Sequence, residues 1–168
     1  MISKKITSQL NKQINKEFYS SYLYLGISIW CANAGHTGSQ NWFMVQHEEE
    51  RIHAFKIYNY MLEQGVGVDL LEIKKPTLNF SSLLECFEYS LIHERKMTDS
   101  FNKLSDVAMQ EKDHASYGFL QWFVKEQIEE ESSVGDIISK LKLVRDGNGI
   151  FTIDTQLSER TLISKENL

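Results

Sequence analysis

The sequence predicts an all-α fold: an antiparallel four-helix bundle with a long crossover connection between its second and third helices and a short C-terminal fifth helix. Four long windows place apolar side chains at steps of three and four residues, the period of one helix face. The 168 residues include one proline and nine glycines, which permits long uninterrupted helices. The single proline lies in residues 66–80, a stretch without a helical period. Together these observations favour a bundle whose middle connection is extended.

We expect helices at about 4–33, 39–65, 81–111, 114–145 and 152–163, within a single domain that spans residues 1–168. Ser3 and Asp113 are candidate N-caps for the first and fourth helices. Ser82-x-x-Glu85 has the spacing of a capping box and predicts the start of the third helix.

The connections beyond the two helical hairpins have different expected roles. Extended, residues 66–80 reach roughly 50 Å, whereas a helix of about 27 residues is about 40 Å long. This stretch can therefore cross the bundle and leave the second and third helices parallel. Its apolar side chains are expected to be partly buried: Val66, Val68, Leu71 and Ile73. The turn at 146–149 should end the fourth helix, with Thr152 or Asp154 capping the fifth.

Composition bounds the class of protein. The net charge of −5 argues against nucleic acid as the main partner and suits the attraction of cations. No apolar run reaches transmembrane length, and the N-terminus has no signal-peptide pattern, so we expect no membrane partner. Cys31 and Cys86 are isolated within helical segments, which predicts a reducing cytoplasm as the compartment.

Acidic side chains interrupt all four apolar stripes near mid-length. Glu50 and His53 form a Glu-x-x-His pair on an inward helix face, which is the half-site of a di-metal carboxylate bundle. Glu17, Glu94 and Glu130 lie within the other three stripes, and Gln127 lies one turn before Glu130. Buried glutamates are rare unless they are paired or ligated. Four of them in register therefore indicate a metal site.

The two halves of the chain repeat this pattern at one offset. A shift of 77 residues places Glu17 on Glu94, Glu50 on Gln127 and His53 on Glu130; it also places Glu49 on Glu126. Glu17 and His53 are equidistant from the first predicted turn, and Glu94 and Glu130 are equidistant from the second. The two residues of each pair should therefore lie at the same depth in the bundle. The sequence thus predicts two helical hairpins around a shared centre.

Four carboxylates in a low-dielectric centre need compensating positive charge, and two divalent cations would supply it. One imidazole with several carboxylates suits iron or manganese and also accepts zinc. We assign Glu17 and His53 to one metal, Glu94 and Glu130 to the other, and Glu50 to a bridge between them. Gln127 is then a weak ligand or a hydrogen-bond donor to the ligands.

With this set of residues, the chain resembles the bacterial non-haem ferritins over its whole length. The residues that carry the resemblance are Glu17, Tyr24, Glu50-x-x-His53, Glu94 and Gln127-x-x-Glu130, with the Leu120-Gln121-Trp122 segment before the last pair. The resemblance implies an iron-storage protein that forms a hollow homo-oligomeric cage of 24 subunits. It also implies ferroxidase activity, the oxidation of Fe²⁺ by O₂ or H₂O₂ at a di-iron centre, with ferric oxide mineral stored inside.

The resemblance assigns roles to residues around the centre. It implies a third iron site at Glu49, Glu126 and Glu129, for which the alternative is a solvated acidic face. Tyr24, one heptad after Glu17, should lie above the metals. From its position alone it would be a core tyrosine bonded to a ligand carboxylate. The resemblance to the family implies in addition that this tyrosine donates an electron. Trp122 is expected to serve core packing, and His36, His47, His93 and His114 to lie at exposed or turn positions without a role.

Departures from the related bacterioferritins change two expectations. Those proteins carry Glu-x-x-His in the fourth helix, whereas this chain has Gln127-x-x-Glu130, which should weaken the second metal position. They also carry a haem-ligating methionine beside the second-helix motif, where this chain has Ile52, so no haem is expected.

Three other interpretations remain open from the sequence. A rubrerythrin-type di-iron peroxidase or oxygenase without mineral storage usually keeps two Glu-x-x-His motifs, and this chain has one. A DNA-protecting mini-ferritin binds metal at a subunit interface, often beside a basic tail, and neither feature fits. A metal-free bundle would leave four buried acids unexplained. The apolar tail at 150–163 favours a cage, because it must pack along the bundle end or against other subunits.

Overall fold

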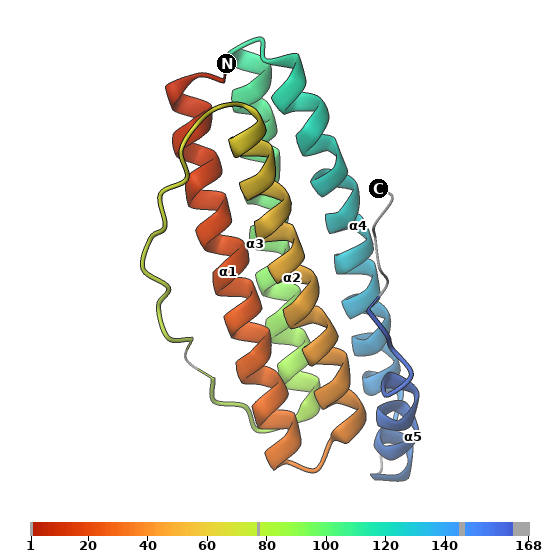
Figure 1. Ribbon diagram of the computed structural model, residues 1–168. Helices are drawn as coiled ribbons and strands as arrows, with labels where there is room; N and C mark the ends of the chain where they lie inside the picture. The colour runs from red at the N-terminus through yellow and green to blue at the C-terminus, as the bar shows by residue number, and fades with distance from the viewer. Residues whose placement is uncertain (1, 77, 145–146, 163–168) are drawn as a thin grey trace.

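A computed structural model of the chain describes residues 2–76, 78–144 and 147–162, and within them it contains five helices and no strand. The helices are α1 (Lys4–Asn33), α2 (Thr37–Glu63), α3 (Leu83–Gln110), α4 (His114–Leu143) and α5 (Gly147–Leu157). Figure 1 shows α1 to α4 packed side by side along one axis, with α5 at one end of the bundle. The predicted all-α four-helix architecture is confirmed.

Short turns join α1 to α2 and α3 to α4, so each of these pairs is antiparallel. The connection between α2 and α3 instead runs the length of the bundle outside α1, which leaves α2 and α3 parallel as expected (Figure 1). We call residues 64–82 the crossing strap. Asn15 of α1 donates from Nδ2 to the carbonyls of Leu71 and Glu72, both at 3.2 Å. These bonds tie the middle of the crossing strap to the outer face of α1.

The apolar side chains of the crossing strap are only partly buried. Val66 and Val68 are half-buried, as predicted, but Leu71 and Ile73 are 46% and 41% exposed. The second pair is less covered than the first, because the strap lies on the bundle surface and one side of it faces outward. Nearer α3 the strap sits closer to α1: a Cβ on Gly26 would fall 2.2 Å from Leu78 Cδ1, so the glycine makes room for that leucine.

The predicted N-caps are present. Ser3 accepts a hydrogen bond from the backbone N–H of Ile6, and Asp113 accepts one from that of Ser116. Ser82 caps α3 by accepting from the backbone N–H of Glu85 at 3.2 Å. Each cap satisfies a helix N–H group that has no partner within the helix.

The fifth helix spans Gly147–Leu157 rather than 152–163: it begins earlier than predicted and ends earlier, because residues 158–162 are not helical, and position 163 lies outside the described residues. Asp154 does not cap it. Instead the buried Asp154 carboxylate caps α2, accepting from the backbone N–H groups of Gly38 (2.9 Å) and Ser39 (2.8 Å). A Cβ on Gly38 would fall 1.6 Å from the Asp154 carbonyl oxygen, so only glycine allows this approach. Docking onto the bundle therefore overrides the weak helix propensity of the turn at 146–149.

The core consists of two apolar clusters, one toward each end of the bundle. One cluster includes Tyr24, Phe43 and Phe87, and the other includes Phe101 and Phe123. Between them lies a layer of buried polar side chains contributed by all four long helices: Glu17, Glu50, His53, Glu94, Gln127 and Glu130. None of the described helices is both long and apolar enough to cross a membrane. The fold therefore sets one polar layer inside an apolar bundle.

Candidate metal centre

The polar layer brings together the mid-helix residues predicted from the repeat. α1 contributes Glu17, α2 contributes Glu50 and His53, and α3 contributes Glu94; α4 contributes Gln127 and Glu130. All six are at most 5% exposed. Each one occupies a position of the inward helix stripe that would otherwise hold an apolar side chain. The structure therefore places four carboxyl groups, one imidazole and one amide inside the bundle.

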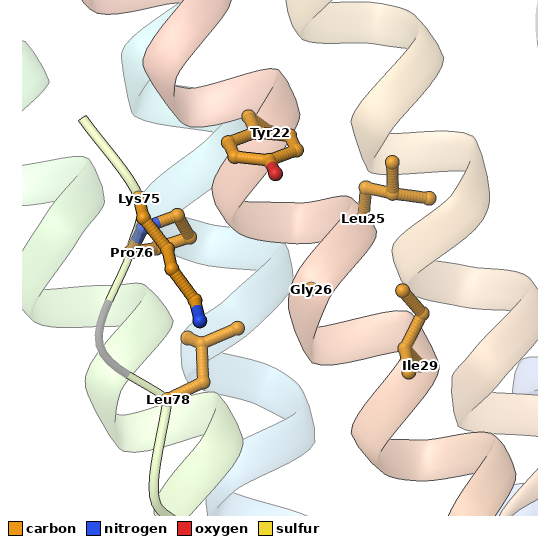
Figure 2. A pocket seen from close by; sticks show the side chains of 7 residues that line it. All are labelled: Tyr22, Leu25, Gly26, Ile29, Lys75, Pro76 and Leu78. Carbon is orange, nitrogen blue, oxygen red and sulfur yellow. The ribbon is translucent and has the colours of Figure 1, made fainter. Parts of the chain in front are cut away.

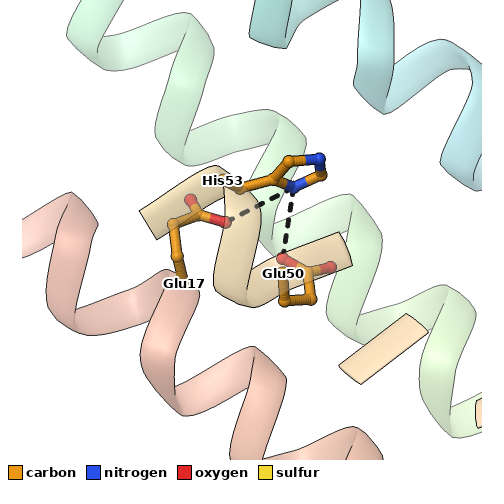
Figure 3. Close-up of side chains that lie close together, drawn as sticks. All are labelled: Glu17, Glu50 and His53. Atoms are coloured by element: carbon orange, nitrogen blue, oxygen red, sulfur yellow. Dashed lines mark ion pairs between the residues drawn. The ribbon is translucent and has the colours of Figure 1, made fainter. Parts of the chain in front are cut away.

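The α1–α2 side of the layer is a compact three-residue group. His53 Nδ1 lies 3.5 Å from Glu50 Oε2 and 4.0 Å from Glu17 Oε2 (Figure 3). One ligand atom from each of these residues lies within 4.8 Å of the others, which is close enough for all three to bind one ion. The carboxylates of α1 and α2 point toward the same imidazole edge from neighbouring helices.

The α3–α4 side is arranged differently, because its carboxylates bond to uncharged donors. Glu94 accepts hydrogen bonds from the Tyr24 hydroxyl and from Gln127 Nε2, the latter at 3.0 Å. Gln127 also donates to the Glu94 carbonyl at 3.2 Å. Tyr24 is fully buried and stacks on Phe43 with a centroid distance of 6.0 Å. Tyr24 is thus a core tyrosine bonded to a candidate ligand.

Glu130 connects the two sides of the layer. Its Oε2 atom accepts from Gln46 Nε2 at 2.7 Å, and Gln46 Nε2 also lies 3.5 Å from Glu50 Oε1. A second group of possible ligands consists of Glu130, His53 and Glu126, again with one ligand atom each within 4.8 Å. His53 belongs to both groups: its Nε2 lies 3.9 Å from Glu126 Oε1, while its Nδ1 faces Glu50. The imidazole therefore has a carboxylate at each nitrogen.

Burial and mutual repulsion govern the protonation of the layer. Burial raises the pKa of Glu17 and Glu130 well above the usual range, and neighbouring carboxylates add to the shift. Burial also raises the pKa of Glu94, to about 8. Burial opposes the charged form of Glu50 as well, but the hydrogen bond and charge of His53 outweigh it and lower the pKa of Glu50. The same contact, acting against burial, raises the pKa of His53.

Two glutamines that support the ligands were not predicted as site residues. Gln13 donates from Nε2 to Glu17 Oε1 at 2.7 Å, and Gln46 donates to Glu130 as described. Both are buried, and each lies four residues before a glutamate of the layer. The repeated Gln-x-x-x-Glu spacing at Gln13–Glu17 and Gln46–Glu50 was the signal that could have found them. An amide donor on a ligand carboxylate fixes the orientation of that carboxylate.

The acids flanking the layer do not form one open cluster in the structure. Glu49 is paired with Arg160, from the segment after α5, and its side chain is 12% exposed. Glu126 is half-buried and faces His53, whereas Glu129 is exposed on α4. Of the three residues expected to hold a third ion, the structure thus places one against a cation, one at the edge of the layer and one on the surface.

Of the histidines outside the layer, His36 lies at the α1–α2 turn and His114 is exposed, as predicted, but the other two are less exposed. His47 and His93 are half-buried helix residues that share hydrogen bonds with Ser21 (2.8 Å) and Ser20 (2.7 Å) of α1. Burial lowers the pKa of His93 to about 4, so its ring is neutral at physiological pH. The prediction of exposed or turn positions was wrong for this pair, because both rings face α1 from neighbouring helices and serine hydroxyls of α1 supply their polar partners.

A four-helix layer of buried carboxylates around a histidine has counterparts among known proteins. Residues 7–144 match the family model of the ferritin-like domain. The chain belongs to the ferritin-like family. It is 37% identical over 162 residues to a bacterial non-heme ferritin of Staphylococcus aureus (strain USA300), covering 96% of this chain and 98% of that one. It is 39% identical over 167 residues to a bacterial non-heme ferritin of Campylobacter jejuni, covering 99% and 100%.

Solved ferritin structures match the fold closely. An open pore ferritin from the hyperthermophilic archaeon Archaeoglobus fulgidus superimposes with a TM-score of 0.95 at 42% identity, covering 96% of this chain and all of that chain. A humanized archaeal ferritin gives a TM-score of 0.95 at 43% identity, covering 97% and 99%. Membership of this family implies iron as the metal, and the carboxylate and histidine groups of the layer are suited to bind it.

Proposed function

We propose that this chain is an iron-storage subunit with ferroxidase activity: it oxidises Fe²⁺ at two positions within each bundle and stores ferric oxide inside a cage of 24 copies. The observation that carries the proposal is the single buried layer to which all four long helices contribute carboxyl groups, with His53 shared by two groups of possible ligands. The ferritin-like domain, together with α5, makes one domain of residues 1–168 in this proposal. The two buried, unbridged cysteines favour the cytoplasm as its compartment.

The two iron positions use different residues. Glu17 and His53 bind the first Fe²⁺, Glu94 and Glu130 bind the second, and Glu50 bridges them. Gln127 holds Glu94 in orientation by its 3.0 Å hydrogen bond and is a weak ligand at most. No haem is part of this proposal, since the side chain nearest the expected axial-ligand position is Ile52, which has no ligand atom.

The layer prepares the reaction through its charges. Fe²⁺ binding replaces the protons that burial keeps on Glu17, Glu94 and Glu130, so the site gains its ionised ligands when the metal arrives. Two Fe²⁺ give up one electron each, and with two protons these electrons reduce O₂ to H₂O₂ or H₂O₂ to two water molecules. Carboxylates favour the more highly charged Fe³⁺ product. Tyr24, bonded to Glu94, is placed to give one further electron to the oxidant at the second position, with release of its phenol proton.

The outer acids extend the site in this proposal. Glu126 and Glu129, with Glu49, hold a third, more exposed iron at the edge of the layer. Its support is the position of Glu126, whose Oε1 lies 3.9 Å from His53 Nε2. An ion there would face Nε2 of His53, on the opposite edge of the ring from the Nδ1 atom that faces the first metal position.

Two surfaces support assembly into a closed shell. An apolar groove runs between α1 and the crossing strap, with Tyr22, Ile29 and Pro76 among its lining residues (Figure 2). Tyr22 and Ile29 are 47% and 56% exposed, and we assign this groove to contact with a second copy across a two-fold axis. At the α5 end, Leu143 and Phe151 are 82% and 72% exposed. Two interfaces of different symmetry close a shell, whereas one gives a dimer or ring.

Electron microscopy of iron-loaded protein, with light scattering on the metal-free protein, tests the proposal. It predicts hollow spheres with dense iron cores. A species no larger than a dimer at micromolar concentration contradicts storage and favours a di-iron peroxidase or oxygenase. Phe151→Asp with Leu157→Asp should weaken the cage while leaving the dimer intact, because α5 lies apart from the groove beside α1; Phe151 is exposed, whereas the change at Leu157 also loosens the packing of α5 on the bundle.

A further inference from the structure

The segment after α5 brings one arginine to the edge of the metal layer. Arg160 donates from one terminal nitrogen to the Glu49 carboxylate and from the other to Gln46 Oε1 at 2.8 Å. Its guanidinium also lies 4.2 Å from the centre of the Trp42 ring. The Arg160 carbonyl accepts from Asn41 Nδ2 at 2.9 Å. The side chain is 20% exposed, so this cation is fixed by several contacts to α2.

These contacts determine how the Gln46 amide faces the metal layer. An arginine side chain has only donors, so Arg160 requires the oxygen of the Gln46 amide to face it. The amide nitrogen must then point the other way, where it lies 2.7 Å from Glu130 Oε2 and 3.5 Å from Glu50 Oε1. Arg160 thus acts on two candidate ligands through a single intervening amide.

The same guanidinium occupies the cation position beside Glu49. Glu49 is one of the three outer acids, and a charge-assisted hydrogen bond holds its carboxylate. An ion that uses Glu49 as a ligand must compete with Arg160 for that carboxylate. Because the pair is partly buried, solvent screening reduces this competition less than it would for a surface pair.

We infer that Arg160 is a positioning residue of the iron site: it orients Gln46 against Glu130 and closes the outer cation position at Glu49. This inference rests on the proposed ferroxidase function. It predicts that the subunit fills its two inner positions before the outer one. It also predicts that release of Arg160 opens the outer position while loosening the second inner position. The C-terminal segment would thereby set the order of iron binding.

Zinc is a suitable probe, because it accepts the same ligands and has no redox chemistry. Calorimetric titration of the assembled, metal-free protein with Zn²⁺ should be compared for the parent, Arg160→Gln, Arg160→Lys and Arg160→Gln with Glu49→Gln. Arg51→Gln is the matched control, because Arg51 also pairs with a glutamate of α2, Glu48 at 2.6 Å, on an exposed face. Thermal unfolding of each variant separates loss of fold from loss of positioning.

Arg160→Gln should bind the outer Zn²⁺ roughly tenfold more tightly, since the ion no longer competes with a charged donor. It should bind Zn²⁺ at the second inner position about tenfold more weakly, the usual effect of losing a hydrogen bond to a ligand. Arg160→Lys should keep the outer position closed but weaken the second position, because an ammonium lacks the fork that spans Glu49 and Gln46. The double variant should no longer bind the outer Zn²⁺ more tightly than the parent, but its affinity at the second inner position should stay weakened.

A parent-like isotherm for Arg160→Gln would overturn the inference, as would equal changes in Arg51→Gln. If Arg160→Gln does not fold, parent-like binding by Arg160→Lys at the second position overturns the positioning role. Failure of the proposed function is distinguishable. In that case the parent itself binds no ion in the layer and does not oxidise Fe²⁺, whatever residue stands at 160.

Discussion

The two halves of the bundle carry related residues at matching positions but treat them differently. In the α1–α2 half, His53 lies 3.5 Å from Glu50 and keeps that carboxylate ionised in the absence of metal. In the α3–α4 half, Glu94 bonds to Tyr24 and Gln127 instead, and burial raises its pKa to about 8. The α1–α2 half therefore already holds one ionised ligand and has only the proton of Glu17 to release, whereas the α3–α4 half must release protons from both Glu94 and Glu130 and give up hydrogen bonds. A duplicated backbone can thus present one tight and one exchangeable position.

The largest expected effect comes from breaking the α1–α2 half. Glu50→Ala or His53→Ala should slow Fe²⁺ oxidation by about tenfold or more, because both remove a ligand from the prepared position. Stopped-flow absorbance of the ferric product measures the rate, and circular dichroism checks that helicity survives. His114→Ala, at the exposed start of α4, is the matched histidine control. Parent-like rates in both site variants would remove these residues from the reaction.

A second change makes the halves alike. Gln127→Glu together with Glu130→His gives α4 the Glu-x-x-His pattern that α2 carries 77 residues earlier. The second position should then bind Fe²⁺ roughly tenfold more tightly, since an imidazole and a carboxylate replace a carboxylate and an amide. Anaerobic titration, followed by a chelator challenge, measures the iron retained. If the double variant releases iron as fast as the parent, the weakness of the second position does not arise from these two residues.

The comparison also predicts an opposite pH dependence for metal-free and metal-loaded protein. Between pH 4.5 and about 8 the folded, metal-free protein keeps a proton on Glu94 that the unfolded chain releases. Its stability should therefore fall as pH rises through this window, by roughly 10 °C or more in Tm. Metal binding should strengthen over the same window. Glu94→Gln should reduce the slope of the metal-free profile, with the remainder due to Glu17 and Glu130, and an unchanged slope in that variant would place the titration elsewhere.

The smallest effect concerns the outer acids. Changing Glu49, Glu126 and Glu129 together to alanine should alter the ratio of iron oxidised to oxygen consumed while fast oxidation continues. An oxygen electrode with stopped-flow detection measures both quantities on one sample. A parent-like ratio would make these residues a solvated acidic face and nothing more.

The sequence predicted the fold well because its evidence was local. Helix periodicity, the caps at Ser3, Ser82 and Asp113, and the length of the crossing strap each constrain neighbouring residues. The start of α5 was mistaken because its cause is distant. Asp154 binds the N-terminus of α2, more than a hundred residues away, and this docking stabilises a helix that begins at glycine.

The candidate site shows the same difference between residues marked by local sequence patterns and residues brought in by distant contacts. Glu17, Glu50, His53, Glu94 and Glu130 were predicted because they interrupt apolar stripes at a repeated spacing, and the structure brings all of them into one layer. Gln13 and Gln46 were both missed although each lies four residues before a glutamate of the layer, because an uncharged amide in an inward stripe stands out less than a carboxylate. Arg160 could not be found from the sequence, because it was placed within the expected helix at 152–163, whereas in the structure it follows α5 and reaches Gln46 across 114 residues.

Anomalous X-ray diffraction at the iron edge, from crystals soaked anaerobically in Fe²⁺, measures the occupancy of each iron position in the layer. We expect two iron peaks in each bundle. One, at full occupancy, should lie among Glu17, Glu50 and His53, and a second, partly occupied, should lie beside Glu94 and Glu130. Equal occupancy would contradict the difference between the halves. No iron within the layer would contradict the site itself.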